Sequence, residues 1–526
     1  MSSISPKDNT SSSDAQNNNL GGLRLRNEET NEIILIPTPT NDPNDPLNWS
    51  KPYRVYIAVL VSCAIFFCNF LAAGPTVAIV SITESFFGPP GPEFTHQIAK
   101  IAYFFTTTAL LQGMGNLIWM PLIAKYGRRP IYIISFVLYT CVSAWAGAAT
   151  TYGSSLAARI FMGFASGAAE CLAPLTISDL FFLHERGAIM VIYTTALSTG
   201  VGVGIIVAGL ITINLDWRYI YWVAVALIGS CTVLIIFTFP ETVYNRNGIS
   251  DETRTVDNPD TARTQHAKDE DLDPEIVQSE DITANRRSST SLTPKLVLLT
   301  LPPVLWATLV MSVTIGFLVA ISSNFAVAFS NTYGFKPWQA GLCFFACPIG
   351  AGIGAFFGGR FSDMVADRLT RDNNGIRQPE MRLPAIIISV FTTPLALVLY
   401  GVGIDHAWHW IVPTIGLGLL NFSIVQATNI SLVYTIDSYR PVAGELAVTQ
   451  HAFKSAFGFL LSFYTNPWID ESGYSNAFGA MAGISGSVLL LWIPMYIWGR
   501  RVRQSTWSWG FIERLVHWHK DREVGE

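Results

Sequence analysis

Residues Leu296 to Phe335 read LVLLTLPPVLWATLVMSVTIGFLVAISSNFAVAFSNTYGF and contain no Asp, Glu, Lys or Arg. An apolar helix of about 20 residues is long enough to cross the hydrocarbon core of a bilayer. Because lipid offers no partners to backbone N–H and C=O groups, a stretch of this kind is expected to be helical. It therefore predicts at least one transmembrane helix.

Eight further stretches lack all four charged residue types: Val55–Thr83, Ile101–Ala124, Pro130–Ala158, Ala188–Leu215, Tyr219–Pro240, Pro337–Gly359, Leu383–Ile404 and Ser472–Gly499. A turn at residues 150–153 separates the third span from a fourth, which carries Arg159 and Glu170. Residues 406–435 and 446–467 supply two more spans. The chain is thus predicted to be an all-α membrane protein with about twelve transmembrane helices.

The composition agrees with a membrane protein. Of 526 residues, 50% are hydrophobic and 13% are charged, which is too apolar for a soluble chain of this length. The net charge of -5 says little about partners because the charged residues lie in predicted tails and loops, and no basic patch suggests nucleic acid. The seven cysteines fall within predicted spans and are interpreted as small apolar fillers, so no disulfide, metal site or cofactor is expected.

Three segments are predicted to lie outside the membrane. Residues 1–50 are rich in Ser, Asn, Asp and Pro and are expected to form a disordered tail. Residues 243–294 are too charged to fold alone and are interpreted as a linker. Residues 500–526 form a second tail, either solvated or lying on the membrane as an amphipathic helix.

Basic residues cluster in every second gap between the spans. The clusters are Lys51 and Arg54; Lys125, Arg128 and Arg129; Arg186; Arg286, Arg287 and Lys295; Arg360, Arg368, Arg371, Arg377 and Arg382; Arg440; and Arg500. By the positive-inside rule, both termini and the linker are predicted to be cytoplasmic, which requires an even number of spans. The linker follows the sixth span, so two six-helix halves, residues 51–242 and 295–499, are expected around a central cavity.

The loops of the two halves resemble each other. MPLIAKYGRRP (Met120–Pro130) corresponds to GGRFSDMVADRL (Gly358–Leu369), and DLFFLHERG (Asp179–Gly187) corresponds to DSYRPVAGE (Asp437–Glu445). In the second pair of loops, an acidic residue ends one span and an Arg precedes the next. This arrangement favours an ion pair across the cytoplasmic turn. Charged turns are ordinary, but their recurrence in both halves predicts gating loops, with the residues Lys125, Gly127, Arg128, Arg129, Asp179, Arg186, Asp363, Arg368, Asp437 and Arg440.

Several stretches together resemble motifs of the major facilitator superfamily. They are KYGRRP (125–130), RIFMGFASGAAE (159–170), DWRYIYW (216–222) and FPETVYNR (239–246); DPLNWSKPYR (45–54) and RLTRDNNGIRQPEMRL (368–383) resemble signatures of its fungal members. The resemblance is to the fungal twelve-span drug:proton antiporters and to related carriers of polyamines and other cations. It covers residues 45–499, implies the major facilitator fold, and implies that Arg159 influences proton binding. It does not specify the substrate.

Two departures from the family pattern limit what it implies. Ala124 and Met120 stand where the first loop usually has Asp and Gly, whereas the second-half loop keeps Gly359 and Asp363. An acidic switch of the family kind would thus depend on the second half. In the fifth span, GVGVGIIVAGL (200–210) lacks the proline of the antiporter motif, although its small residues still favour close helix packing.

Glu170 is the strongest candidate for proton coupling. It lies about three turns beyond Arg159, near the middle of the fourth span, where a carboxyl group is costly unless it faces a cavity or a partner. Burial favours the protonated form of a carboxyl, so Glu170 is predicted to take up and release a proton or to bind a cation. The alternative is a structural carboxyl hydrogen-bonded between helices, and for Arg159 the alternative is a structural anchor.

Other polar residues in the spans are candidates for the substrate cavity. Together with Glu170 they are Asn69, Asn324, Asn421, Gln426 and Lys454. Each amide residue has the alternative of bridging two helices by hydrogen bonds. Lys454 is predicted to lie at the depth of Glu170, so the two opposite charges are expected to face the cavity and neutralise each other. The alternative is that Lys454 reaches an interface or packs within its own half.

These features predict a proton-coupled secondary transporter that exports small organic molecules by alternating access, in a fungal plasma membrane. The partners expected are a small-molecule substrate, protons and lipid, and a monomer is expected. No Gly-Lys pair occurs, so the ATP-binding motif that contains it is missing, and no HExxH or Ser-His set suggests an enzyme. Two alternatives stay open: proton-driven uptake of a polyamine or another organic cation, and a transporter-like nutrient sensor.

Overall fold

The computed structural model describes residues 23–24, 39–40, 42–91, 93–244, 297–373, 376–439, 442–507 and 509. The described part is almost entirely helical. A pair of two-residue strands, β1 (Leu23–Arg24) and β2 (Ile376–Arg377), runs antiparallel, and a 3-10 turn, η2 (Pro46–Asn48), precedes the first long helix.

The first half contains six spans, two of them interrupted. The first is α1 (Lys51–Ala73), which continues through the 3-10 turn η3 (Gly74–Ala78) into α2 (Ile79–Phe87). The second is α3 (Phe94–Met114) followed by α4 (Asn116–Tyr126). The others are α5 (Arg128–Ala148), α6 (Tyr152–Leu180), α7 (Leu183–Ile211) and α8 (Arg218–Thr238).

The second half follows the same plan. A 3-10 turn, η5 (Leu298–Thr300), precedes α13 (Pro302–Tyr333). The eighth span is built from α14 (Pro337–Cys343), α15 (Ala346–Phe356), a π-helical turn η6 (Phe357–Phe361) and α16 (Ser362–Asp372). The remaining elements are the 3-10 stretch η7 (Pro379–Ile386), α17 (Ile387–Asp405), α18 (Ile411–Ser438), α19 (Ala443–Leu490) and α20 (Trp492–Trp507).

Twelve spans account for these helices. Ten segments among the described residues are long and apolar enough to cross a membrane, and one of them, residues 444–506, is interrupted at Gly473 by a φ of 80°. That break divides the segment into an eleventh and a twelfth span. The more polar second span, α3 with α4, brings the total to twelve. The predicted fold class, a twelve-helix membrane protein in two six-helix halves, is therefore confirmed.

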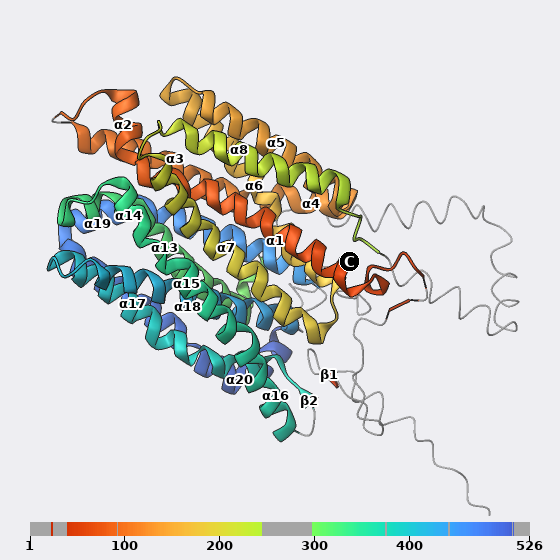
Figure 1. Ribbon diagram of the computed structural model, residues 1–526. Coiled ribbons are helices and arrows are strands. Elements are labelled where there is room, and N and C mark those ends of the chain that lie inside the picture. Colours follow the sequence, from red (N-terminus) through yellow and green to blue (C-terminus); the bar gives the residue numbers. More distant parts are fainter. Residues whose placement is uncertain are drawn as a thin grey trace, which may run out of the picture.

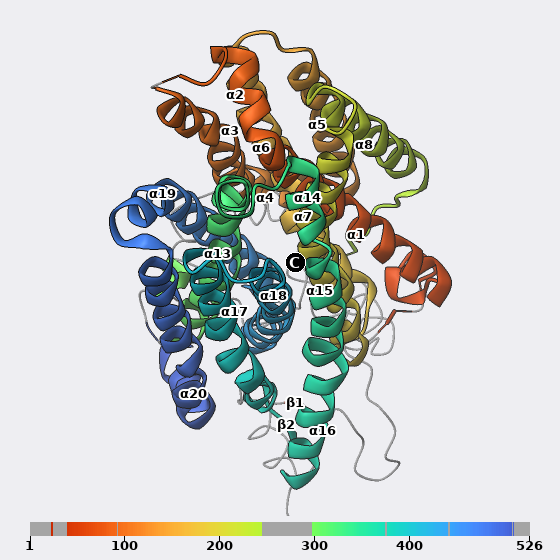
Figure 2. The same cartoon turned by 60° about the vertical axis from the view of Figure 1, so that its left-hand side comes forward.

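The two halves form two adjoining bundles of long helices (Figure 1). Figure 1 shows the red-to-yellow helices of the first half beside the green-to-blue helices of the second, and Figure 2 shows the same division after rotation. The loops with the most basic residues meet at one end of the molecule, called here the basic end. Lys51 at the start of α1 contacts Glu185 in the first turn of α7 there, with an Nζ–Oε1 distance of 3.1 Å.

Glycines on α7 let this helix pack closely against both halves. A Cβ atom at Gly200 would lie 2.6 Å from the Phe66 carbonyl oxygen of α1, and a Cβ at Gly202 would lie 2.7 Å from the Cys347 Cβ of α15. Neither distance is possible for a real side chain without movement of a neighbour. α7 therefore packs against α1 of its own half on one face and against α15 of the other half on the opposite face (Figure 2). The close packing expected from the small residues of this span is present.

The folded region extends beyond two of the predicted boundaries. Residues 42–50 were expected in a disordered tail, yet Asp45 accepts a hydrogen bond of 3.1 Å from the Leu47 N–H at the start of η2, and Leu47 is buried. At the other end, the last helix continues past Gly499 to Trp507. Arg503 in this extension is buried and forms an ion pair with Glu380. Nearly all of the predicted linker, residues 245–294, and the tail beyond residue 509 lie outside the described residues.

Candidate functional site

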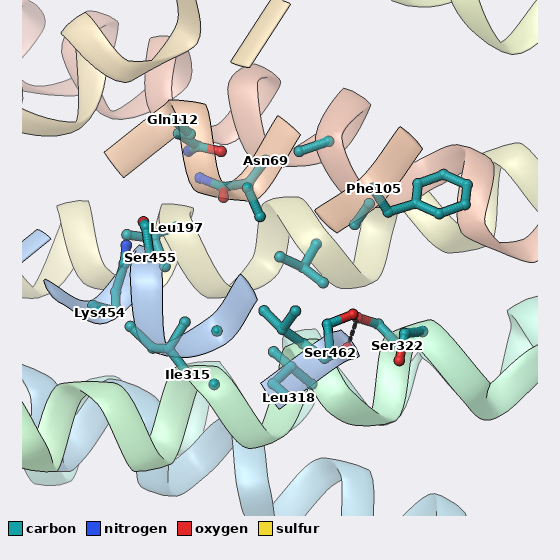
Figure 3. Close-up of a pocket in the computed structure, with 18 of the residues that line it drawn as sticks. Asn69, Phe105, Gln112, Leu197, Ile315, Leu318, Ser322, Lys454, Ser455 and Ser462 are labelled. Carbon is teal, nitrogen blue, oxygen red and sulfur yellow. Dashed lines mark hydrogen bonds between the residues drawn. The ribbon is translucent and has the colours of Figure 1, made fainter. Parts of the chain in front are cut away.

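A cavity of about 110 Å³ lies between the two halves (Figure 3). Helices α1, α3, α6 and α7 of the first half and α13, α18 and α19 of the second contribute its walls. Apart from Phe105, the apolar lining consists of Ala, Gly, Val, Leu and Ile residues. The polar lining residues are Asn69, Thr76, Gln112, Glu170, Ser198, Ser322, Ser323, Lys454, Ser455 and Ser462.

Glu170 and Lys454 are the two charged residues among those that line the cavity. Glu170 lies on α6 with a side chain that is 1% exposed, and Lys454 lies on α19 with a side chain that is 8% exposed. The Lys454 ammonium donates a hydrogen bond to Oε1 of Glu170, forming an ion pair that joins the two halves. The contact expected between these residues is present, and Lys454 does not reach an interface.

His451 is a third ionisable group at this position. It lies on α19, one turn before Lys454, and its Nδ1 is 3.6 Å from Oε1 of Glu170. Both ring nitrogens are buried without a hydrogen-bond partner in the described part of the chain, as are both amide atoms of Asn116 on α4, which adjoins the Glu170 carboxyl. The Glu170 carboxyl therefore has unused hydrogen-bonding groups around it in addition to Lys454.

Most of the polar lining residues labelled in Figure 3 lie toward the two ends of the cavity, and Asn69 lies between them. In Figure 3, Lys454, Ser455 and Gln112 lie toward one end, and Ser322 and Ser462 lie toward the other. The apolar wall between them includes Ile315 and Leu318. The site is thus an apolar channel with an ion pair at one end and hydroxyl groups at the other.

Three of the six residues predicted for the cavity line it, namely Asn69, Glu170 and Lys454. The other three are not among its lining residues, and their amides bridge neighbouring helices. Asn324 donates to Asn466 at 2.8 Å, Asn421 accepts from Ser198 at 2.7 Å, and Gln426 accepts from Ser389 at 2.6 Å. A buried amide needs several partners. Those partners lie at helix contacts, and one of them, Ser198, itself lines the cavity.

The prediction missed several lining residues because they are small or uncharged. Ser322, Ser323 and Ser462 are ordinary residues in membrane helices, and Gln112 lies near the break between α3 and α4. His451 was also missed. A signal was available for it, since it lies three residues before Lys454, a spacing that places both side chains on one face of a helix.

Arg159 lies in a different environment from Glu170. It is fully buried on α6, about 16 Å along the helix axis from Glu170. Its Nε donates to the Tyr221 hydroxyl at 2.9 Å, and its guanidinium lies over the rings of Phe105 and Tyr221 at 5.2 and 5.1 Å. In the described part of the chain no carboxylate lies within 4.0 Å of it. Phe105, which lines the cavity, is therefore the link between Arg159 and the site.

The predicted gating residues of the first half form one network at the basic end. Arg128 Nε is 3.2 Å from Asp179 Oδ2, and Glu241 accepts hydrogen bonds from the backbone N–H groups of Arg128 and Arg129 at 2.9 and 3.1 Å. Gly127, with a φ of 91°, allows the chain to turn between α4 and α5. Lys125 is exposed, and Arg186 donates to the Ser178 carbonyl oxygen at 2.8 Å. The partners of Arg128 described here lie within the first half.

The second-half loop forms a matching network. Asp363 accepts from Arg382 at 2.7 Å and from Arg377 at 3.5 Å, while Arg368 is exposed. Burial, together with the charge of Arg382, lowers the pKa of Arg377, whereas the carboxylate of Asp437 opposes that shift. Arg440 lies outside the described residues.

Contacts between the halves occur at both ends of the cavity. At the basic end, a Cβ atom at Gly359 would lie 2.9 Å from the Val191 side chain, and a Cβ at Gly187 would lie 3.0 Å from the Arg382 guanidinium. At the opposite end, the rings of Tyr103 on α3 and Phe463 on α19 stack with centroids 6.1 Å apart. The structure thus holds the halves together above and below the ion pair.

Three similar proteins match this chain over most of its length and over most of their own. The chain is 26% identical to an MFS-type transporter of Schizosaccharomyces pombe, over 90% of this chain and 89% of that protein. It is also 26% identical to the protein HOL1 of Saccharomyces cerevisiae, over 91% of each chain. MFS transporter cpaT of Aspergillus oryzae is 24% identical over 92% of this chain and 95% of that protein.

Solved structures support the fold. The human organic anion transporter MFSD10 aligns with a TM-score of 0.59 and 15% identity over 84% of this chain and 100% of that chain. The xylose transporter XylE from E. coli aligns with a TM-score of 0.56 and 16% identity over 84% of this chain and 98% of that chain. The family model of the Major Facilitator Superfamily matches residues 55–444. The chain is therefore a multi-pass membrane transporter, not an enzyme, and it belongs to the Major Facilitator Superfamily.

Proposed function

We propose that this transporter is a proton-coupled exporter of small organic molecules that works by alternating access between its two halves. The observation that carries the proposal is the ion pair between Glu170 and Lys454, which joins α6 of one half to α19 of the other inside the cavity. Two buried charges are stabilised strongly only while they face each other. Separation of the halves therefore requires that each charge finds another partner.

Protonation of Glu170 supplies such a change. A neutral carboxyl no longer holds the lysine, so uptake of a proton weakens the contact between α6 and α19 at the level of the cavity. Substrate bound beside the pair acts on the same contact. Both events then bias one equilibrium between two arrangements of the halves, which is the requirement for coupling.

The gating residues are assigned to the basic end. The networks around Asp179 and Asp363 each hold a loop within its own half, while Arg382 approaches Gly187 across the halves. We assign the basic end to the cytoplasm by the positive-inside rule and place the protein, as a monomer, in the fungal plasma membrane. Arg159 acts on the cavity through Phe105.

The alternative of organic-cation uptake is less well supported. A cation site would be expected to offer a carboxylate that is free to receive the ligand, whereas Glu170 already holds Lys454. The alternative of a nutrient sensor requires a receiving domain, and the described part of the chain consists of the two halves and short flanking segments.

A growth experiment tests the function. The protein is expressed in a fungal strain that lacks its own drug exporters and is challenged with toxic organic compounds of different charge. Resistance and reduced accumulation are expected for the unmodified protein and should change when a protonophore collapses the proton gradient. Glu170→Gln should abolish resistance, while Glu84→Gln, a change at an exposed carboxyl on α2, should not. Increased sensitivity on expression would instead favour uptake.

A further inference from the structure

We propose that the transported substrate is a small amphipathic carboxylate whose anionic group binds Lys454 in place of Glu170. This inference rests on the proposed transport function and specifies the substrate class of the same cavity. It follows from a difference between the two partners of the ion pair, since they differ in exposure and in what each could bind if the other left.

Both members of the pair line the cavity, and Lys454 is the more exposed of the two. Its side chain is 8% exposed, whereas the Glu170 side chain on α6 is 1% exposed. Figure 3 shows Lys454 beside Ser455 and Gln112, which can donate further hydrogen bonds to an anion. An incoming carboxylate therefore meets a cation with neutral donors next to it. An incoming cation would first meet Lys454 and be repelled.

Loss of the ion pair should cost Glu170 less free energy than it costs Lys454, because Glu170 has other polar groups beside it. Its Oε2 has no hydrogen-bond partner in the described part of the chain, His451 lies 3.6 Å from Oε1, and Asn116 adjoins the carboxyl with both amide atoms unused. Lys454 has no second carboxylate within 4.0 Å among the described residues. A carboxylate ligand leaves Lys454 paired, whereas a cationic ligand would leave it buried and unpaired, which is strongly unfavourable.

The exchange is balanced by one proton. When the ligand carboxylate takes Lys454, the released Glu170 carboxylate accepts a proton from water, and the total charge of the site is unchanged. Ligand and proton therefore cross the membrane in the same direction, and export follows the outward gradient of the carboxylate. The groups that face Glu170 during this step are Lys454 and His451 on α19, Asn116 on α4, Tyr193 on α7 and Cys68 on α1. Lys454, when it holds a ligand, no longer opposes protonation of Glu170.

The remainder of the cavity defines the body of the ligand. Beyond the ion pair the wall is apolar, with Leu197, Ile315 and Leu318, and the far end offers the hydroxyl groups of Ser322 and Ser462. No acid other than Glu170 is among the lining residues. A ligand with an apolar middle, a carboxylate at one end and a hydroxyl or carbonyl group at the other complements all three regions.

Binding of three isosteric probes tests the substrate class without any gradient. The probes are 3-phenylpropionate, 3-phenylpropionamide and 3-phenylpropylamine, and their affinities for the purified full-length protein in detergent are measured by calorimetry. The carboxylate should bind more tightly than the amide and the amine. Glu170→Gln, which releases Lys454, should tighten carboxylate binding by about tenfold, comparable with one charge-assisted hydrogen bond. Lys454→Met should weaken it by at least about tenfold.

Controls separate loss of binding from loss of folding. Lys100→Met removes an exposed lysine on α3 and should change no affinity. The double variant Glu170→Gln/Lys454→Met carries no unpaired charge, so it should fold and still bind the amide as the unmodified protein does. In weakly buffered solution, carboxylate binding should remove about one proton from the medium in the unmodified protein and none in Glu170→Gln.

The binding assay tests the substrate class and the protonophore experiment tests the transport function, so either one can fail without the other. Preferential binding of the amine, equal binding of all three probes, or weaker carboxylate binding in Glu170→Gln would overturn the anion proposal while leaving proton-coupled transport in place. Failure of the protonophore to affect resistance would contradict the proposed function, and the binding results would not depend on it.

Discussion

The Glu241 carboxylate accepts a hydrogen bond of 2.9 Å from the backbone N–H of Arg128, a residue 113 positions earlier in the chain. This contact ties the segment after the sixth span to the N-terminus of the third. In the second half, Arg503 in the last helix pairs at 3.3 Å with Glu380 before the ninth span. In each half a carboxylate thus links the chain beyond the last span to the start of the third span, and its partner is a backbone N–H in the first half and an Arg side chain in the second.

Loss of the contact between Glu241 and the Arg128 N–H should destabilise the first half. In Glu241→Ala, the N-terminus of α5 loses the carboxylate that caps it, at a typical cost of about 1 kcal/mol. A lower Tm for the purified protein is expected in a thermal unfolding assay. Glu84→Ala removes an exposed carboxyl from α2 and should leave Tm unchanged. Equal Tm values for both variants would show that the cap contributes nothing.

Loss of the ion pair between Arg503 and Glu380 should be more costly because this pair is buried. Glu380 and Arg503 are 3% and 1% exposed, and removal of one partner leaves the other as an unpaired buried charge. Arg503→Met should destabilise the protein by about 3–5 kcal/mol and lower its yield in the membrane. The double variant Arg503→Met/Glu380→Gln should recover most of the loss, and Arg500→Met, at an exposed arginine, should have no effect. A double variant as unstable as the single one would refute this account.

The pH dependence of transport should follow the ion pair. Glu170→Gln cannot be protonated, so any residual movement of substrate should occur without net export and at a rate independent of pH, while the protein stays folded in the membrane. Lys454→Met removes the cation that stabilises the ionised carboxyl, so the pH profile should move to higher pH. His451 faces the same carboxyl at 3.6 Å, so its replacement by Gln tests whether the profile belongs to Glu170. An unshifted profile in Lys454→Met would contradict the coupling.

Gly113 should be sensitive to any added side chain. A Cβ atom there would lie 2.1 Å from Ser455 Cβ and 2.8 Å from the His451 carbonyl oxygen, at the crossing of α3 and α19. Gly113→Ala should push the two helices apart beside Lys454 and reduce the transport rate at least several-fold. Gly479→Ala adds a methyl group where no atom lies within 4 Å, and it should transport normally. Normal transport by Gly113→Ala would show that the crossing is not required to be tight.

The orientation is tested by labelling from outside intact cells. With Cys63 and Cys141 replaced by Ser, a membrane-impermeant thiol reagent should modify a cysteine placed at Glu84 or Asp405. A cysteine at Asn373, at the basic end, should be modified only after permeabilisation. Labelling at Asn373 in intact cells would reverse the assigned orientation.

Most spans could be predicted from the sequence because they are apolar runs without charged residues, and the even number follows from the alternation of basic loops. The contact between Glu170 and Lys454 could also be predicted. Few charges occur within the spans, and an isolated charge in hydrocarbon is costly, so two opposite charges at one depth are expected to meet.

The cavity could be predicted only in part. From Leu420 to Ser438 every residue of α18 is buried, so the helix has no exposed face to distinguish. Asn421 and Gln426 on this helix were predicted for the cavity because they are polar and lie on a span that lines the cavity in the superfamily the chain resembles, and in the structure they bond Ser198 and Ser389. A sequence records the identity of a polar residue, but the direction in which it points depends on neighbours from other helices.

The pairing of Glu170 with Lys454 also has an electrical consequence. Moving one elementary charge across a membrane potential changes the free energy by about 2.3 kcal/mol per 100 mV. A pair of opposite charges that stays together carries no net charge through that field. The loaded site, with a ligand carboxylate on Lys454 and a proton on Glu170, contains such a pair. Its movement is therefore expected to proceed at the same rate in polarised and depolarised cells, and the membrane voltage should do no work on this step.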